Sequence, residues 1–224
     1  MKAHTVHAFL TFILMLAAIY AVFVYAPTEL TMGEVQRIFY FHVSSAWISF
    51  LAIFLVFLFS LLSLLKSSRH WDIRSASAAE IGAVFCTLVL ITGPIWAKPV
   101  WGIWWTWDAR LTSFFVLWLI YMGYLMLRRL VESAEQRAKL SAVFAILGAV
   151  DVPIVYMANR WWRTQHPQPV IAGGEKSGLD PEMRIALFIS LAAFTLLFFY
   201  LWRLRCNLEE LNDSGEALQR RLQS

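Results

Sequence analysis

Two histidines beside aromatic clusters have the chemistry of ligands to a transition metal. His42 lies in FYFHVSSAW at positions 39–47, and His166 ends RWWRTQH at positions 160–166. A neutral imidazole binds such metals well when its second ring nitrogen has a hydrogen-bond acceptor that orients it. A histidine near a helix end is also commonly a capped or solvated residue, so each histidine taken alone leaves both interpretations open.

The densest group of tryptophans lies in WGIWWTWDARLT at positions 101–112, and its members are Trp101, Trp104, Trp105 and Trp107. Indole rings offer a large apolar area and stack on planar π systems, with about 0.5–1.5 kcal/mol per contact beyond burial. A porphyrin is a planar π system of this kind. The alternative is an interfacial belt, because tryptophan is enriched where lipid headgroups meet hydrocarbon.

Charged residues flank these tryptophans. Arg110 and Lys98 could pair with the two carboxylates of a porphyrin, and the guanidinium fork of arginine matches a carboxylate better than an ammonium group does. We expect Asp108 to accept hydrogen bonds from backbone N–H groups or to pair with Arg110, and not to act as a catalyst.

A membrane domain must position these side chains. The 224 residues are 59% hydrophobic and only 15% charged, which is typical of an integral membrane protein. A bilayer core needs roughly 20 apolar residues per helix. Six segments come close to this length, at 8–26, 39–65, 81–97, 111–127, 140–158 and 185–202. We therefore predict an all-α protein with six transmembrane helices in one domain over 1–206, followed by a short cytoplasmic tail over 207–224.

Charge predicts the orientation of these helices. Six spans place both termini on one side together with the second and fourth loops, and this side carries twelve of the 19 Lys and Arg residues, against seven on the other. The positive-inside rule therefore predicts cytoplasmic termini and an external tryptophan-rich loop between the third and fourth helices. Basic inner loops beside anionic lipid account for the net charge of +4, so the lipid bilayer is a partner and no nucleic acid is expected.

The predicted topology helps to decide whether the tryptophans bind a ligand or form an interfacial belt. A belt would place tryptophans at both interfaces, whereas only Trp71 and Trp202 map to the inner end. The topology also places His42 and His166 on one outer face. A flat apolar ligand outside the membrane would explain both observations. The tryptophans of the outer half are Trp47, Trp96, Trp101, Trp104, Trp105, Trp107, Trp118, Trp161 and Trp162.

Three further segments carry local predictions. Asp180-Pro181-Glu182 predicts the start of the sixth helix, with proline and acid in its first turn. The tail is expected to form a frayed helix that breaks at Asp213-Ser214-Gly215. Asp151 is the one charged residue inside the six segments, and a functional role and a packing role beside Pro153 both remain open.

The sequence WGIWWTWDARLT resembles the tryptophan-rich WWD signature of a family of haem-handling membrane proteins. Within this family, the length and the number of spans resemble haem exporter protein C, which acts in cytochrome c maturation, over nearly the whole chain. The resemblance implies that His42 and His166 are the two axial ligands of haem iron. It also implies that the tryptophans of the loop, with Asp108 and Arg110, bind the cofactor. One departure is Ser44, where the family pattern has proline.

The resemblance further implies a function. Haem b would be bound at the periplasmic face of the bacterial inner membrane and delivered to a membrane-anchored periplasmic haem chaperone for cytochrome c biogenesis. The implied partners also include the ATPase and permease subunits of an ABC transporter and a small single-span membrane subunit. The sequence contains no P-loop motif, so we expect a haem-transfer protein and not an enzyme. Arg163, close to His166, is a further candidate for binding a haem propionate.

Two other classes of protein remain as alternatives. A small membrane transporter or channel subunit would need paired polar groups or broken helices near the membrane midplane. Its only candidates, Gly93-Pro94 and Asp151 with Pro153, lie near the outer surface. A b-haem electron-transfer subunit would need histidines at more than one depth, whereas His42 and His166 share one rim of the membrane.

Overall fold

The computed structural model describes residues 2–162, 164–166 and 179–223. Within this part of the chain, six helices are long and apolar enough to cross a membrane, which confirms the predicted fold class. The helices are α1 (Lys2–Tyr20), α2 (Ile38–Lys66), α3 (Arg69–Trp101), α4 (Ala109–Leu130), α5 (Ala134–Trp161) and α6 (Pro181–Gln223). A π-helical turn over Ala21–Tyr25 extends α1, and a 3-10 turn over Glu34–Arg37 leads into α2.

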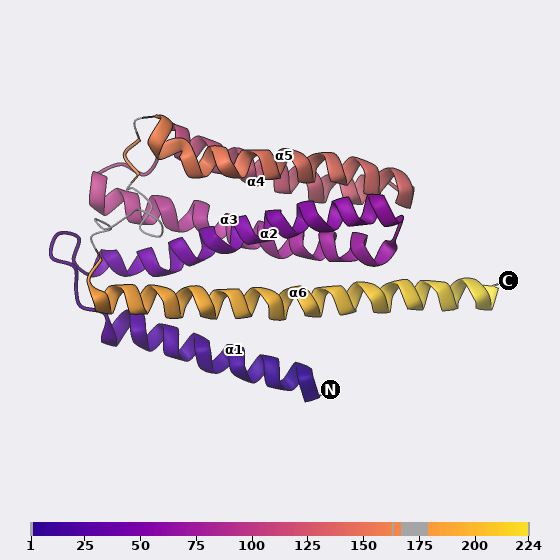
Figure 1. Cartoon of the computed structure of the whole chain (residues 1–224), viewed down its shortest axis with the longest axis horizontal. Helices are drawn as coiled ribbons and strands as arrows, with labels where there is room; N and C mark the ends of the chain where they lie inside the picture. The colour runs from indigo at the N-terminus through magenta and orange to yellow at the C-terminus, as the bar shows by residue number, and fades with distance from the viewer. Residues whose placement is uncertain (1, 163, 167–178, 224) are drawn as a thin grey trace.

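The helices run roughly along one long axis (Figure 1). α2 and α3 pack on each other at the centre, α4 and α5 form a pair on one side, and α1 packs along α6 on the other. Both termini lie toward the same end, which we call the terminal end, and the C-terminus extends well beyond the N-terminus. The opposite end, which we call the loop end, holds the tryptophan-rich connection between α3 and α4, the end of α5 and the start of α6.

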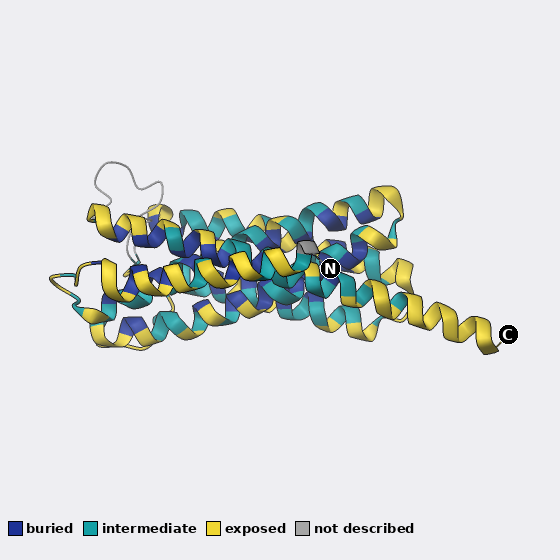
Figure 2. Ribbon diagram, turned by 90° about the horizontal axis from the view of Figure 1, so that it is seen from below, coloured by how far each residue is buried: buried dark blue, intermediate teal, exposed yellow. Residues whose placement is uncertain are grey.

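Burial follows the pattern expected for a bundle surrounded by lipid. Buried residues gather where helices face one another, while α1 and the far part of α6 are largely exposed (Figure 2). The exposed side chains of α1 are large and apolar, and they include Phe9 and Phe12. An apolar surface of this extent would be unfavourable in water but is the surface that a bilayer requires.

Gly82 lies where α2, α3 and α4 approach one another closely. A Cβ atom at Gly82 would lie 2.7 Å from Cβ of Ala52 in α2 and 2.6 Å from the hydroxyl of Tyr121 in α4. Tyr121 is itself held in place, because its hydroxyl donates a hydrogen bond to the carbonyl of Ser49 at 3.1 Å. Small residues allow such close packing of transmembrane helices.

We expect Gly82→Ala to destabilise the bundle by about 1–3 kcal/mol, because the added methyl group overpacks the contact between α2 and α3. The thermal midpoint in detergent, followed by size-exclusion fluorescence, measures the effect. Gly215→Ala is the matched control, since nothing lies within 4 Å of a Cβ at that position. Equal midpoints for the two variants would contradict the prediction.

Several helix ends differ from the sequence prediction. α3 begins at Arg69 and ends at Trp101, so it extends beyond its apolar segment in both directions. The loop that follows is therefore shorter than predicted, and it begins at Gly102, whose positive φ of 77° ends the helix. The predicted start of α6 is confirmed, because the helix begins at Pro181 with Glu182 in its first turn.

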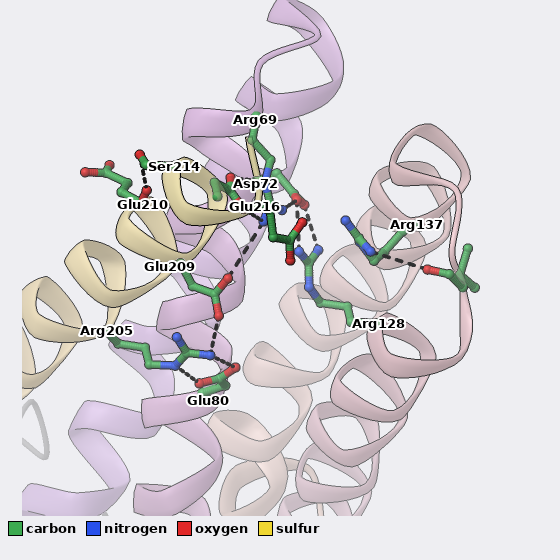
Figure 3. A network of polar contacts seen from close by, with 12 residues as sticks. Arg69, Asp72, Glu80, Arg128, Arg137, Arg205, Glu209, Glu210, Ser214 and Glu216 are labelled. Carbon is green, nitrogen blue, oxygen red and sulfur yellow. Dashed lines mark hydrogen bonds and ion pairs between the residues drawn. The ribbon is translucent and has the colours of Figure 1, made fainter. Parts of the chain in front are cut away.

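The predicted break in the tail is wrong. α6 continues through Asp213-Ser214-Gly215 to Gln223 as one helix. The side chain of Asp213 accepts hydrogen bonds from Nε and Nη2 of Arg69 at 2.8 and 2.9 Å, and the Ser214 hydroxyl donates to the carbonyl of Glu210 at 2.8 Å. Contacts of this kind at the terminal end connect α6 to α3 (Figure 3), and they stabilise helical structure beyond the apolar span.

Candidate functional site

A small cavity of about 40 Å³ lies at the loop end, among α2, α3, α4 and the segment that contains His166. Its walls combine the two histidines singled out in the sequence with Trp105 and Arg110, and apolar side chains such as Phe114 complete the lining. The fold therefore brings four of the predicted site residues to one place, although they come from three separate parts of the chain.

The two imidazole rings lie close together, at a distance that suits a shared metal. The ring centroids of His42 and His166 are 6.4 Å apart, with an angle of 36° between the ring planes. Two imidazoles that bind one metal at about 2 Å from each nitrogen have centroids about 6 Å apart. The observed centroid distance is therefore close to that of two imidazoles that share one metal.

His42 is held by α3. It is buried near the start of α2, and its Nδ1 lies 2.9 Å from the hydroxyl oxygen of Thr92. A Cβ at Gly93 would be 3.4 Å from Cε1 of the ring, so the absent side chain lets the imidazole lie against the helix. The indole of Trp96 packs at 5.9 Å between centroids. These contacts fix the plane of the ring.

Arg110 lies in the first turn of α4 and reaches α5. Its Nη1 donates to the carbonyl of Val155 and to Oδ1 of Asn159, both at 3.3 Å. The amide nitrogen of Asn159 in turn donates to the backbone carbonyl of His166 at 3.2 Å. Within the described residues, Nε and Nη2 of Arg110 make no hydrogen bond, so half of the guanidinium fork remains available to an anion.

The tryptophans of the loop separate into two groups. Trp105 lines the cavity, and its buried Nε1–H has no acceptor among the described residues. Trp107 packs edge-on against Trp105 at 5.7 Å but is 74% exposed, and Trp104 is 58% exposed. Trp101 is the last residue of α3 and does not line the cavity. The four tryptophans therefore do not share one stacking surface in this structure.

Asp108 caps α4. Its Oδ1 accepts hydrogen bonds from the backbone N–H groups of Arg110 and Leu111, both at 3.0 Å, and its Oδ2 accepts from the hydroxyl of Thr106 at 2.9 Å. The prediction of a structural acceptor is confirmed. This cap fixes the first turn of α4, and with it the position from which Arg110 reaches the cavity.

Asp151 and Arg163 are two other residues that the sequence put forward. Asp151 is buried in α5, and its Oδ2 has no hydrogen-bond partner among the described residues, but it is not part of the cavity lining. Arg163, a candidate for binding a propionate, lies outside the described residues.

Three residues at the site escaped the sequence analysis. Thr92 and Asn159 are polar residues near the outer ends of apolar segments, and nothing in their spacing connects them with His42 or His166. The sequence pointed to Gly93 only as part of Gly93-Pro94, a candidate helix break. Their contacts depend on how the helices pack, so a single sequence carries no direct signal for them.

The residues present fit a haem better than a bare metal ion. Within the part of the chain that the structure describes, no group of three or more His, Cys, Asp or Glu residues is placed to hold a metal. Two imidazoles would therefore bind a metal that brings its other ligands with it, as iron in a porphyrin does. The unpaired Nε1–H of Trp105 and the free part of the Arg110 fork offer donors to a polar edge of such a ligand.

Comparison with known proteins identifies the family. The model of the family described as haem exporter protein C matches residues 1–221. The chain belongs to this family. A haem exporter protein C of Bradyrhizobium diazoefficiens is 37% identical over 173 residues, which cover 77% of this chain and 66% of that protein. The family is one of haem-handling membrane proteins of cytochrome c biogenesis, as the sequence resemblance implied.

Other members of the family match at similar levels. The haem exporter protein C of Haemophilus influenzae is 31% identical over 215 residues, which cover 96% of this chain and 87% of that protein. The protein of the same name in Escherichia coli strain K12 is 33% identical over 175 residues, which cover 78% of this chain and 70% of that protein. The match to the Haemophilus protein leaves little of either chain unaligned.

Proposed function

We propose that this protein binds haem b at the loop-end cavity and delivers it to a membrane-anchored periplasmic haem chaperone. The observation that carries the proposal is the pair of imidazoles, 6.4 Å apart between centroids, which line one cavity together with Arg110 and Trp105. His42 and His166 would bind the iron, one from each side. Membership of a haem exporter family supports the choice of haem as the cargo.

The other residues would hold the porphyrin. The free donors of Arg110 suit a propionate, because a guanidinium and a carboxylate form a charge-assisted pair. Trp105 supplies an apolar wall. Trp104 and Trp107 are exposed beside the cavity, and exposed aromatic residues commonly mark a surface that a partner protein covers. We propose that these two tryptophans contact the chaperone.

Orientation and partners belong to the same proposal. The predicted excess of Lys and Arg on the terminal side supports termini in the cytoplasm, a tail over 207–224 on that side, and a loop end in the periplasm of a bacterial inner membrane. The ABC transporter subunits and the small single-span subunit would join the protein in a complex, because the protein itself lacks a P-loop motif.

The test is a titration of the detergent-purified protein with haemin, followed by absorption. We expect a Soret band and the spectrum of six-coordinate iron with two imidazole ligands, and a pyridine extract should contain haem b. Incubation with purified chaperone should then move the haem to the chaperone. Protein that stays colourless after expression with ample haem and after titration would overturn the proposal.

Arg110 gives a further prediction within this proposal. Arg110→Gln should weaken haemin binding by about 30-fold or more, because the loss of one partner of a buried charge pair costs at least about 2 kcal/mol. Haem dimethyl ester, which has no free carboxylates, should bind the variant and the wild type equally. Arg160→Gln is the control, since Arg160 lies on α5 at the same end and contacts Tyr156 instead of the cavity. An equal loss of affinity for the ester would count against a propionate contact.

A further inference from the structure

Thr92 in α3 makes two short polar contacts with its hydroxyl oxygen. Oγ1 lies 2.7 Å from the backbone carbonyl oxygen of Leu88, one turn earlier in the same helix, and 2.9 Å from Nδ1 of His42 in α2. A third contact, to the carbonyl of Val89 at 3.5 Å, is much longer. The single hydroxyl proton of Thr92 can serve only one of the two short contacts.

The position of this proton determines the form of the imidazole. A carbonyl oxygen has no proton to donate, so a separation of 2.7 Å between two oxygens requires that the Thr92 hydroxyl donate to Leu88. The lone pairs of Thr92 then remain for His42, and Nδ1 must be the protonated nitrogen. In the opposite assignment, Thr92 would donate to Nδ1 and leave two acceptor oxygens 2.7 Å apart with no proton between them.

We propose that Thr92 is a positioning residue that holds His42 as its Nδ1–H tautomer, so that Nε2 keeps its lone pair for iron. This inference rests on the proposed function, because it assigns His42 a ligand role. Nε2 makes no hydrogen bond within the described residues, whereas Nδ1 is bound to Thr92. Metal-binding histidines generally have this arrangement, in which the second ring nitrogen donates to a fixed acceptor.

The neighbours of Thr92 support the same assignment. A Cβ atom at Gly93 would lie 3.4 Å from Cε1 of His42, so glycine leaves the ring room to lie close to α3. Gly93, His42 and His166 all line the cavity. α3 therefore fixes one edge of the imidazole, while the opposite nitrogen remains for the ligand.

Because the acceptor is a hydroxyl, it also affects how readily the protein would release haem. A carboxylate in this position would be a strong acceptor and would raise the basicity of the ligand nitrogen. A neutral hydroxyl that already donates its own proton polarises the imidazole less. A weaker bond from His42 to iron suits a protein that hands haem on, in contrast to one that retains it for electron transfer.

The first test needs no haem. The protein is labelled with ¹⁵N-histidine and its nitrogen chemical shifts are measured in detergent, with the His42 signals assigned by comparison with His42→Ala. We expect a protonated Nδ1 and an unprotonated Nε2 in the wild type and in Thr92→Ser, and a mixture of tautomers in Thr92→Val. An Nε2–H tautomer in the wild type, or an unchanged spectrum in Thr92→Val, would overturn the proposal.

The second test uses haemin. Thr92→Val should bind haemin about 10–100-fold more weakly than the wild type, and Thr92→Ser should restore most of the affinity, because serine supplies the same hydroxyl. If the wild type binds no haemin, the proposed function fails while the nitrogen spectra still decide the tautomer. If all three proteins bind haemin equally, the proposed function stands and the role of Thr92 is overturned.

Discussion

Replacement of either His42 or His166 by alanine is expected to weaken haemin binding by at least about 100-fold. Loss of a residue that merely orients a metal ligand costs 10–100-fold in affinity, and loss of the ligand itself should cost no less. The measurement is the Soret absorption of the purified variants during titration with haemin. Each variant should also lose the spectrum of iron with two imidazole ligands, because one axial position is vacated.

Two controls separate ligation from a general loss of structure. His70→Ala should bind haemin as the wild type does, because His70 is exposed in α3 at the terminal end, away from the cavity. Free imidazole in the buffer should restore the wild-type spectrum of His42→Ala or His166→Ala, since it can take the vacant position. Undiminished binding in the double variant would rule out both histidines as ligands.

The sequence was sufficient to predict the number of helices and their order, because an apolar segment long enough to span a bilayer leaves few alternatives. It was less informative about where helices end. Residues 69–80 of α3 and the end of α6 are polar, yet both remain helical. Hydropathy indicates which part of a helix contacts lipid. The helix itself is maintained by backbone hydrogen bonds, and these can continue beyond the bilayer where side-chain contacts stabilise them.

The candidate site was predicted in part. The sequence identified His42, His166, Trp105 and Arg110, which the fold brings to one cavity, because their residue types suit a porphyrin and the topology placed them at one face. It grouped Trp101, Trp104 and Trp107 with them, although these three do not line the cavity. The sequence shows that several tryptophans lie close together along the chain. The direction of each side chain, however, depends on the turn at Gly102 and on the cap at Asp108.

The same limit explains why Thr92 and Asn159 were missed. Each acts by a hydrogen bond to a residue on another segment, Thr92 to His42 and Asn159 to the backbone of His166. Such partners are set by the register between helices. A small shift of α3 along its axis would leave the sequence motifs of both histidines unchanged. It would nevertheless move Thr92, the acceptor that orients His42, out of reach.

The terminal end carries the other prediction with a large expected effect. Asp72 is buried in α3, and its carboxylate accepts from Nη1 and Nη2 of Arg128 at 2.6 and 2.9 Å and from Nη1 of Arg69 at 2.6 Å. The pair joins α3 to α4, and Arg69 extends the contacts to α6 (Figure 3). The side chain of Arg128 is only 11% exposed, so its positive charge depends on the carboxylate of Asp72 for compensation.

Asp72→Ala is therefore expected to destabilise the protein by about 3–5 kcal/mol, the usual cost of leaving one member of a buried ion pair without its partner. Unfolding in detergent, followed by tryptophan fluorescence, measures the loss. Asp72→Ala combined with Arg128→Met should recover part of it, because the second change removes the uncompensated charge. Glu135→Ala is the matched control, since its pair with Lys139 is exposed on α5 at the same end and should matter little. If Asp72→Ala were as mild as Glu135→Ala, the ion pair would not hold α3 and α4 together.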